Sequence, residues 1–408
     1  MDAATIMERC EVLSGISEEQ GLLVRRYGSD AMRRANETVA GWMRGTGMDV
    51  RTDAIGNLIG RYEGTDNGTF ILGSHLDTVR DAGKYDGPLG VLVALACIER
   101  LRDRGERLPF AIEVPAFADE EGLRFGTTYL GSSHYVGAFD AELLQLEDRD
   151  GMTLGDAVLA FVGDQEFLAG TASAPEDTIG YCEVHIEQGP VLDENNLPVG
   201  VVSAITGLTR AQAGFSGSAG HAGTVPMDGR RDALCAAAEL VLEAEAAAKA
   251  EPGSVATVGE ISVRPGAGNV IPGNVDLSLD IRHGDDEFRG RLRDSLERRA
   301  GGIAEDRGCE LRWQVRQESV AVPADEQLVG SLSRAIEDTG IEALQLPSGA
   351  GHDAAQMAVI CPVAMLFVRC AGGISHNPAE SVADEDVESA IGVMGCFLRL
   401  VAEARVRR

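Results

Sequence analysis

One glycine-punctuated stretch of the chain gathers residue types that bind metal ions. Residues 73–90, GSHLDTVRDAGKYDGPLG, hold one histidine and three aspartates directly after the strand-like run 69–72. Side chains alternate along a strand, so His75 and Asp77 should share a side, where the Asp77 carboxylate can accept a hydrogen bond from the far ring nitrogen of a metal-bound His75. Asp86 precedes a helical run and is either an N-cap or a metal ligand. Beside the other candidates, we favour the ligand.

Two adjacent glutamates follow the next apolar strand-like segment. In FADEEG, Glu120 and Glu121 repel each other unless a cation compensates their charge or their roles differ. One can bind a metal while the other carries a proton, as metal-assisted hydrolysis requires. A solvated acidic turn is the alternative, and it would be preferred if this were the only signal.

The chain has seven histidines, and two more of them stand at expected strand ends. His185 lies in HIEQGP, followed by Gln188, and His376 lies in ISHNPAE after the apolar run VAMLFVRC. A lone histidine in such a place is more often structural. Together with His75, Asp86 and the glutamate pair, however, the set could hold two divalent metals about 3.5–4 Å apart with one carboxylate bridging them. The eight cysteines are scattered singly, which argues against a thiolate site.

These candidates need a sheet to position them, and the sequence predicts one. Strand-like runs such as NLIGRYE and FAIEVPAFADEEG alternate with helical runs such as GVLVALACIERLRDRG, which is typical of an α/β fold with a mainly parallel sheet and helices on both faces. Residues 208–322 show a different pattern of two helices and a few strands, so we expect an inserted α+β domain there. Residues 1–207 and 323–408 would then form one discontinuous domain that carries the metal site.

Composition argues against several other classes of protein. The net charge of −29 repels nucleic acid. No run approaches the ~18 uninterrupted apolar residues of a membrane span, and no signal peptide is visible, so we expect a cytoplasmic protein without membrane contact. GAGNVIPG lies between two expected strands, and no helix directly follows GFSGSAG, so neither a phosphate loop nor a nucleophile elbow is predicted.

Ten ordered motifs resemble a known family, and they span nearly the whole chain. They are GSHLDTV, YDGPLGV, FADEEGLRFG, HIEQGPVL, GHAGTVPM, RRDA, NVIPG, LDIR, PSGAGHDA and GISHNPAE. The set is similar to the hydantoinase/carbamoylase branch of the dinuclear-metal amidohydrolases, which includes N-carbamoyl-L-amino-acid hydrolases, allantoate amidohydrolases and β-ureidopropionases.

The resemblance implies a role for each candidate metal ligand. His75 and His185 would bind one metal, and Glu121 and His376 would bind the other. Asp86 would bridge the two. The metals would be two divalent ions, and a donor set of histidines and carboxylates suits Zn, Mn, Co or Ni.

The resemblance also implies catalytic and substrate-binding residues. Glu120 would be the general base that takes a proton from water and returns it to the leaving nitrogen. The inserted domain would be a lid that also forms a homodimer, and its His221 would reach into the partner's active site and help to stabilise the oxyanion. Beside His221, three residues would hold the substrate, with the last suited to clamp a carboxylate: Gln188, Asn269 and Arg282.

The expected activity is hydrolysis of the ureido C–N bond of a small carboxylate, an N-carbamoyl-L-amino acid or allantoate, with release of ammonia and CO2. SGAGHDA favours allantoate hydrolases, whereas FVRC before GISH favours carbamoylases. Departures from the pattern at Ala82, Leu123 and His134 bear on substrate choice rather than on the reaction. Two alternatives stay open: an N-acyl-amino-acid deacylase or dipeptidase with the same metal chemistry, and a non-catalytic binding protein on this fold.

Overall fold

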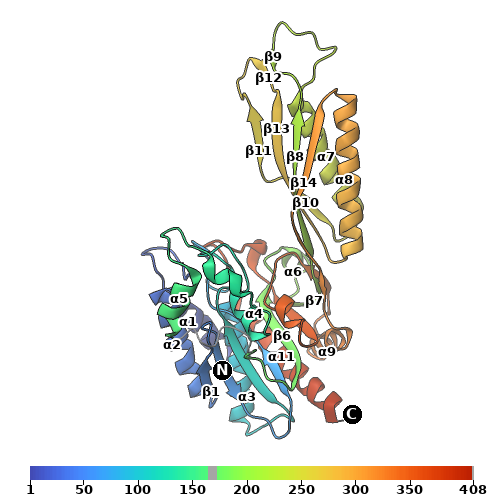
Figure 1. The fold of residues 1–408 in the computed structure, drawn as a ribbon. Coiled ribbons are helices and arrows are strands. Elements are labelled where there is room, and N and C mark those ends of the chain that lie inside the picture. The colour runs from blue at the N-terminus through green and yellow to red at the C-terminus, as the bar shows by residue number, and fades with distance from the viewer. Residues whose placement is uncertain (164–171, 407–408) are drawn as a thin grey trace. The chain divides into compact units, whose positions relative to one another are not determined.

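The computed structural model describes residues 1–163 and 172–406, which form two compact units (Figure 1). Unit 1 contains Met1–Ser203, Ala324–Leu346 and Gly351–Arg408. Unit 2 contains Ala204–Pro323 and Pro347–Ala350. The chain therefore builds unit 1 from segments that are far apart in sequence.

Most of the larger sheet belongs to unit 1. Its strands are β1 (Asp49–Thr52), β2 (Leu58–Tyr62), β3 (Thr69–Leu72), β4 (Ser74–His75), β5 (Ala111–Phe117), β6 (Thr178–Ile186), β7 (Val199–Ile205), β15 (Val322–Pro323), β16 (Gln345–Ser348) and β17 (Val363–Val368). They run in the order β1-β2-β5-β3-β6-β17-β7-β15, with β4 beside β5 and β16 beside β7. The central pairs β5–β3, β3–β6 and β6–β17 are parallel, and the outer pairs are antiparallel. The carboxyl ends of the central strands therefore meet at one edge.

Helices of unit 1 cover both faces of this sheet. They are α1 (Ala3–Ser14), α2 (Asp30–Gly45), α3 (Pro88–Asp103), α4 (Leu130–Tyr135), η1 (Ala141–Gln145), α5 (Leu154–Val162), α6 (Val191–Glu194), α9 (Glu326–Glu337), α10 (Ala354–Met357), η2 (Ala371–Gly373) and α11 (Asp384–Val406). On one face, the Phe70 ring lies 5.7 Å from that of Phe397 in α11. On the other, the Glu183 carboxylate accepts a hydrogen bond from the backbone N–H of Ala354 in α10. Strands covered on both sides are mostly apolar, as the fully buried β3, β5 and β17 are apart from Thr69 and Glu113.

Unit 2 contains a five-stranded antiparallel sheet covered by two helices on one face, and a separate two-stranded sheet formed by β9 and β12 (Figure 1). Its elements are β8 (Gly207–Ser216), β9 (Gly220–His221), α7 (Ala233–Ala250), β10 (Val255–Thr257), β11 (Ile261–Arg264), β12 (Val270–Ile271), β13 (Asn274–His283), α8 (Asp286–Asp306) and β14 (Glu310–Ser319). Alternate residues of β13, such as Leu277 and Leu279, pack in one core with Ala237 and Leu240 of α7 and Leu296 of α8. Strand alternation therefore gives the five-stranded sheet one apolar face and one polar face.

The predicted fold class, an α/β fold with a mainly parallel sheet and a smaller α+β part, is confirmed. The predicted domain boundaries at 208 and 322, and the role of this segment as a lid, stay predictions. In the described part of the chain no helix is long and apolar enough to cross a membrane.

Candidate metal centre

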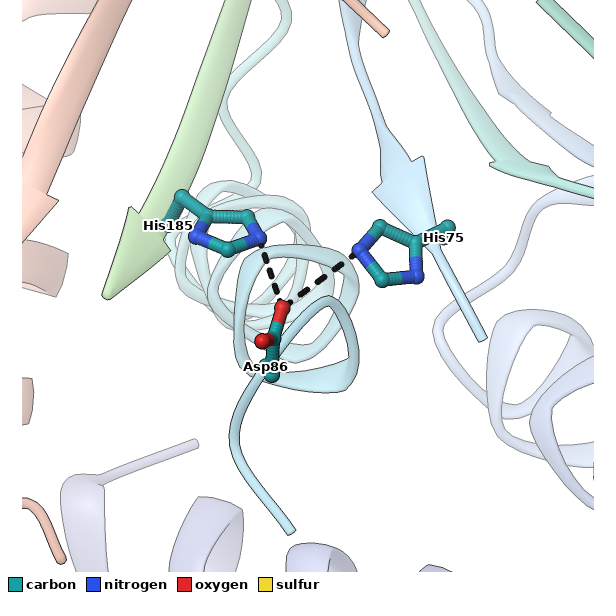
Figure 2. Close-up of side chains that lie close together, drawn as sticks. All are labelled: His75, Asp86 and His185. Atoms are coloured by element: carbon teal, nitrogen blue, oxygen red, sulfur yellow. Dashed lines mark ion pairs between the residues drawn. The ribbon is translucent and has the colours of Figure 1, made fainter. Parts of the chain in front are cut away.

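Two buried histidines face the same aspartate at the end of the parallel strands. His75 ends β4 and His185 lies near the end of β6, and their rings stack with centroids 5.8 Å apart. The Nε2 atoms lie 3.6 Å (His75) and 3.1 Å (His185) from Oδ1 of Asp86 (Figure 2). The Nδ1 atoms are 3.1 and 2.9 Å from the backbone oxygens of Asp77 and Ile186. Backbone contacts on the far side of each ring thus turn both Nε2 atoms toward Asp86.

The loop before α3 delivers Asp86 to these histidines. Gly87, not Asp86, is the N-cap of α3, and no side chain caps this helix, so the Asp86 carboxylate is left to the site. Gly87 has a φ of 81°, and a Cβ there would lie 2.4 Å from Cε1 of His75. Both the backbone angle and the close approach of the imidazole require glycine at this position.

The second oxygen of Asp86 faces a different pair of residues. Its Oδ2 lies 3.2 Å from Nε2 of His376, and that nitrogen is 3.4 Å from Oε1 of Glu121. His376 is in the loop after β17 and is about half exposed, unlike His75 and His185. Asp86 therefore offers one oxygen to each of two groups of possible ligands.

The Asp77 carboxylate binds the backbone amides of the two glutamates, a contact that alternation along a strand does not predict. β4 ends at His75, so Asp77 lies beyond the strand. Its carboxylate oxygens each accept a backbone hydrogen bond, from Glu120 N and Glu121 N, both at 3.1 Å. The Asp77 carboxylate is 3.6 Å from Nδ1 of His75, whereas its backbone oxygen is at 3.1 Å. At hydrogen-bonding distance, His75 thus meets the carbonyl of Asp77 instead of the predicted carboxylate.

Burial and close charges shift the proton affinities of these groups. Burial raises the pKa of Glu120 well above its ordinary value. Burial opposes ionisation of Asp86, but the neighbouring histidines, His185 above all, hold its pKa well below the usual range. Burial also opposes a charged His75, yet the carboxylates of Asp77 and Asp86 raise its pKa well above the ordinary value. Such shifts in one small cluster are typical of functional sites.

The donor set fits divalent cations. Among the described residues, four groups that include predicted ligands have potential ligand atoms within 4.8 Å of one another: His75, Asp86 and His185; Asp86, Glu121 and His376; His75, Glu120 and Glu121; and Glu183, His185 and His352. Imidazoles and carboxylates without thiolates suit zinc and its neighbours among the first-row metals. The residues present therefore match a cation centre in both chemistry and spacing.

Further polar residues surround the centre, and sequence reasoning assigned them otherwise or not at all. Gln188, predicted to bind substrate, has a φ of 59° and directs its Nε2 to Oδ2 of Asp86 at 2.9 Å. Ser375 donates to the same oxygen at 2.9 Å. His352 is buried with its ring centroid 4.6 Å from that of His185, and burial followed by the charge of His185 lowers its pKa well below the ordinary value. His352 lies in the motif SGAGHDA and Ser375 lies in GISHNPAE, but neither motif gave a reason to select these residues.

The remaining predicted substrate residues belong to unit 2. His221 in β9 is exposed, and its Nδ1 accepts from Gly223 N at 3.1 Å. The backbone oxygen of Asn269 accepts from Ala222 N at 2.9 Å, which places Asn269 beside His221. The Arg282 guanidinium donates to Asp280 at 2.7 and 3.1 Å and to the Gly349 carbonyl at 2.6 Å. Their predicted contacts with substrate stay predictions.

Comparisons with known proteins agree over most of the chain. The family described as "Peptidase family M20/M25/M40" matches residues 71–400. A probable allantoate deiminase of Oryza sativa subsp. japonica is 41% identical, over 94% of this chain and 85% of that protein. An N-carbamoyl-L-amino acid amidohydrolase of Geobacillus stearothermophilus is 41% identical, over 87% of each chain.

Solved structures give the same answer. The crystal structure of an amidase of the hydantoinase/carbamoylase family from Burkholderia multivorans is 31% identical, covers 97% of each chain and has a TM-score of 0.92. The resemblance predicted from the ordered motifs is confirmed. This chain belongs to the peptidase family M20/M25/M40, and it is similar to an amidase of the hydantoinase/carbamoylase family.

Proposed function

We propose that this protein is a metal-dependent amidohydrolase that cleaves the ureido C–N bond of a small carboxylate and releases ammonia and CO2. The observation that carries this proposal is the placement of Asp86, with one oxygen toward His75 and His185 and the other toward His376. The relatives named allantoate deiminase and N-carbamoyl-L-amino acid amidohydrolase support the choice of a ureido bond over a peptide bond.

The proposed centre holds two divalent metals. His75 and His185 bind one metal, Glu121 and His376 bind the other, and Asp86 bridges them. A metal pair of this kind lowers the pKa of water and polarises a carbonyl. Zn, Mn, Co and Ni all suit the donor set, and availability often decides which is bound.

Glu120 is the proposed general base. It belongs to one group with His75 and Glu121, and burial raises the pKa of its carboxyl, which favours uptake of a proton. Glu120 accepts a proton from the water that attacks the ureido carbon and delivers it to the leaving nitrogen. Asp77 supports this role because it fixes the backbone amides of both glutamates.

We assign substrate recognition mainly to unit 2, as part of the same proposal. His221 stabilises the developing oxyanion, and Asn269 and Arg282 hold the substrate, with Arg282 suited to its carboxylate. Gln188 of unit 1 completes this set. The proposal also makes unit 2 a lid and the surface through which two copies form a homodimer.

Ammonia release by the purified, manganese- or zinc-loaded protein tests the proposal. The compounds are allantoate, N-carbamoyl-L-amino acids and N-carbamoyl-β-alanine, with an N-acetyl amino acid as the control. We expect ammonia from allantoate or an N-carbamoyl-L-amino acid. Hydrolysis of the control would yield acetate and an amino acid without ammonia, so the control is followed by release of the free amino acid, and we expect none. Turnover of the acetyl compound alone would make the protein a deacylase, and silence on all four would contradict the ureido assignment.

A further inference from the structure

One buried carboxylate joins the two loops that carry Asp86 and His376. Glu380 lies in the loop after His376 and is 4% exposed. Its Oε1 accepts hydrogen bonds from the backbone N–H groups of Tyr85, at 2.8 Å, and Asp86, at 3.2 Å. These contacts connect positions almost 300 residues apart in the chain. The backbone at Asp86 is therefore held by the segment that supplies His376.

The second oxygen of Glu380 reaches the Asp86 side chain through a serine. Oε2 lies 3.3 Å from Oγ of Ser375, and that hydroxyl donates to Oδ2 of Asp86 at 2.9 Å. Ser375 stands directly before His376, so a single short segment contacts both the main chain and the carboxylate of Asp86. Two kinds of contact therefore limit how this carboxylate can move or rotate.

The neighbouring loop is shaped to admit Glu380. A Cβ at Gly83 would lie 2.3 Å from Cδ and 2.4 Å from Oε1 of Glu380. Any larger residue would collide with the carboxylate. Glu380 is itself fixed by its backbone N–H, which bonds to the Asn377 oxygen at 3.0 Å. The carboxylate thus occupies a fitted position between the two loops.

We propose that Glu380 is a positioning residue that sets the place and orientation of Asp86 through Tyr85, Asp86 and Ser375, and so controls how tightly the metal pair is held. The inference rests on the proposed metal centre. A bridging carboxylate must face two cations at once, and hydrogen bonds to the ligands of a metal commonly set its affinity. The role of Glu380 is to keep both oxygens of Asp86 aimed at their separate groups of ligands.

Metal titration of three variants tests this role directly. Glu380→Ala removes every contact, whereas Glu380→Gln keeps a carbonyl that accepts the two amides and an N–H that donates to Ser375. Asp325→Ala is the matched control, because Asp325 also accepts two backbone amides, Gln327 N and Leu328 N at 3.0 and 2.9 Å, but at the start of α9. The measurements are calorimetric binding of Mn²⁺ alone, metal equivalents retained after dialysis, and the melting temperature.

We expect Glu380→Ala to raise the metal dissociation constant by about 10- to 100-fold, the usual cost of losing a residue that orients ligands. Glu380→Gln should stay near the wild type, and Asp325→Ala should lower the melting temperature without changing metal affinity. If Glu380→Ala does not fold, Ser375→Ala, which removes one hydroxyl, should show a weaker loss of affinity in the same direction.

Other outcomes would overturn the inference in distinguishable ways. Wild-type Mn²⁺ affinity in folded Glu380→Ala, or in Ser375→Ala where that is the variant that folds, would end the positioning role and leave the metal centre standing. An equal loss of affinity in Glu380→Gln, or in Asp325→Ala, would trace the effect to charge or to general stability. A wild-type protein that binds no metal would remove the proposed function and this inference together.

Discussion

Buried carboxylates lie near both ends of β5, but their negative charges are balanced in different ways. Near the beginning of β5, Glu113 is 1% exposed. Its carboxylate accepts hydrogen bonds from the Arg51 guanidinium at 3.0 and 3.2 Å and from the Tyr135 hydroxyl at 2.6 Å, and it forms an ion pair with Arg61 at 3.6 Å. Fixed cations and a phenol of the chain itself thus surround this negative charge. A buried carboxylate that is paired and hydrogen-bonded in this way is stable without any added group.

Past the other end of β5, no such compensation is built in. Among the residues that the structure describes, no lysine or arginine forms an ion pair with Asp86, Glu120 or Glu121, and the ion-pair partners of Asp86 and Glu121 are histidines. Histidines can neutralise carboxylates only while they carry protons. The charge of Glu113 is therefore balanced by side chains of the protein itself, and we call this the closed end of β5. The charges past the other end are balanced only when protons or metal ions are added, and we call that the open end.

Removal of metal should have the largest effect on the open end. A chelator is expected to abolish ammonia release, and the metal-free protein should unfold more easily, by about 2.7 kcal/mol for each metal lost relative to protein at a free metal concentration 100 times the dissociation constant. Calorimetric melting of loaded and chelated protein measures the difference. His185→Ala is the control, since it lacks a ligand of one metal and its melting should respond less to the chelator than that of the wild type. An unchanged melting curve in the wild type would contradict the comparison.

Replacement of the base separates chemistry from metal binding. Glu120→Gln should lower kcat by about 100- to 10,000-fold, the usual contribution of a general base, while the variant keeps its metal. Steady-state ammonia release and metal analysis of the same sample check both statements. Glu113→Gln, within β5, is the matched control. It should be less stable but retain kcat per folded molecule, and wild-type activity in Glu120→Gln would show that another group is the base.

Metal binding at the open end should release protons. Hydrogen bonds to Asp86 and then Glu121 raise the pKa of His376 to about 10, so at neutral pH the metal must displace a proton from this ring. Without metal, the protonated ring stabilises the fold below pH 6.5, its ordinary pKa, and this contribution is lost as the pH rises through about 10.

Metal affinity should therefore rise with pH, by about tenfold per pH unit for each proton displaced. Calorimetry in buffers of different ionisation enthalpy counts the protons. His376→Asn should release about one fewer proton, whereas His283→Asn, in unit 2, should leave the count unchanged. A proton count independent of His376 would show that its ring is neutral before metal arrives.

Residue types at strand ends were enough to predict several parts of the centre. His75 and His185 follow apolar runs that became parallel strands, and parallel strands bring their carboxyl ends together. The sequence alone could not show whether Asp86 caps the following helix. The structure shows that it does not, because Gly87 is the N-cap of α3. The roles of these residues at a metal stay predictions.

Contacts between distant segments could not be predicted from the sequence. Alternation along a strand predicted a hydrogen bond between the Asp77 carboxylate and His75. The strand ends at residue 75, however, and the carboxylate accepts hydrogen bonds from backbone amides 43 and 44 residues away. Glu380 gave no signal either, since its partners lie 294 and 295 residues away. Local patterns report strand ends and turns, whereas these hydrogen bonds depend on how loops meet after folding.

We expect the smallest effect from a substitution at the closed end of β5, which should lower stability and leave the metal centre unchanged. Tyr135→Phe removes a 2.6 Å hydrogen bond to the Glu113 carboxylate and should lower the free energy of unfolding by about 1.5–3 kcal/mol, as expected for a bond to a charged group. Tyr62→Phe is the matched control, since its hydroxyl bonds to the neutral Glu106 carbonyl at 3.3 Å and should cost only about 0.5–1.5 kcal/mol. Urea unfolding measures both. Metal equivalents and kcat should match the wild type in each, because the charge at this end is balanced within the fold; a loss of metal in Tyr135→Phe would mean that the two ends of the strand are coupled.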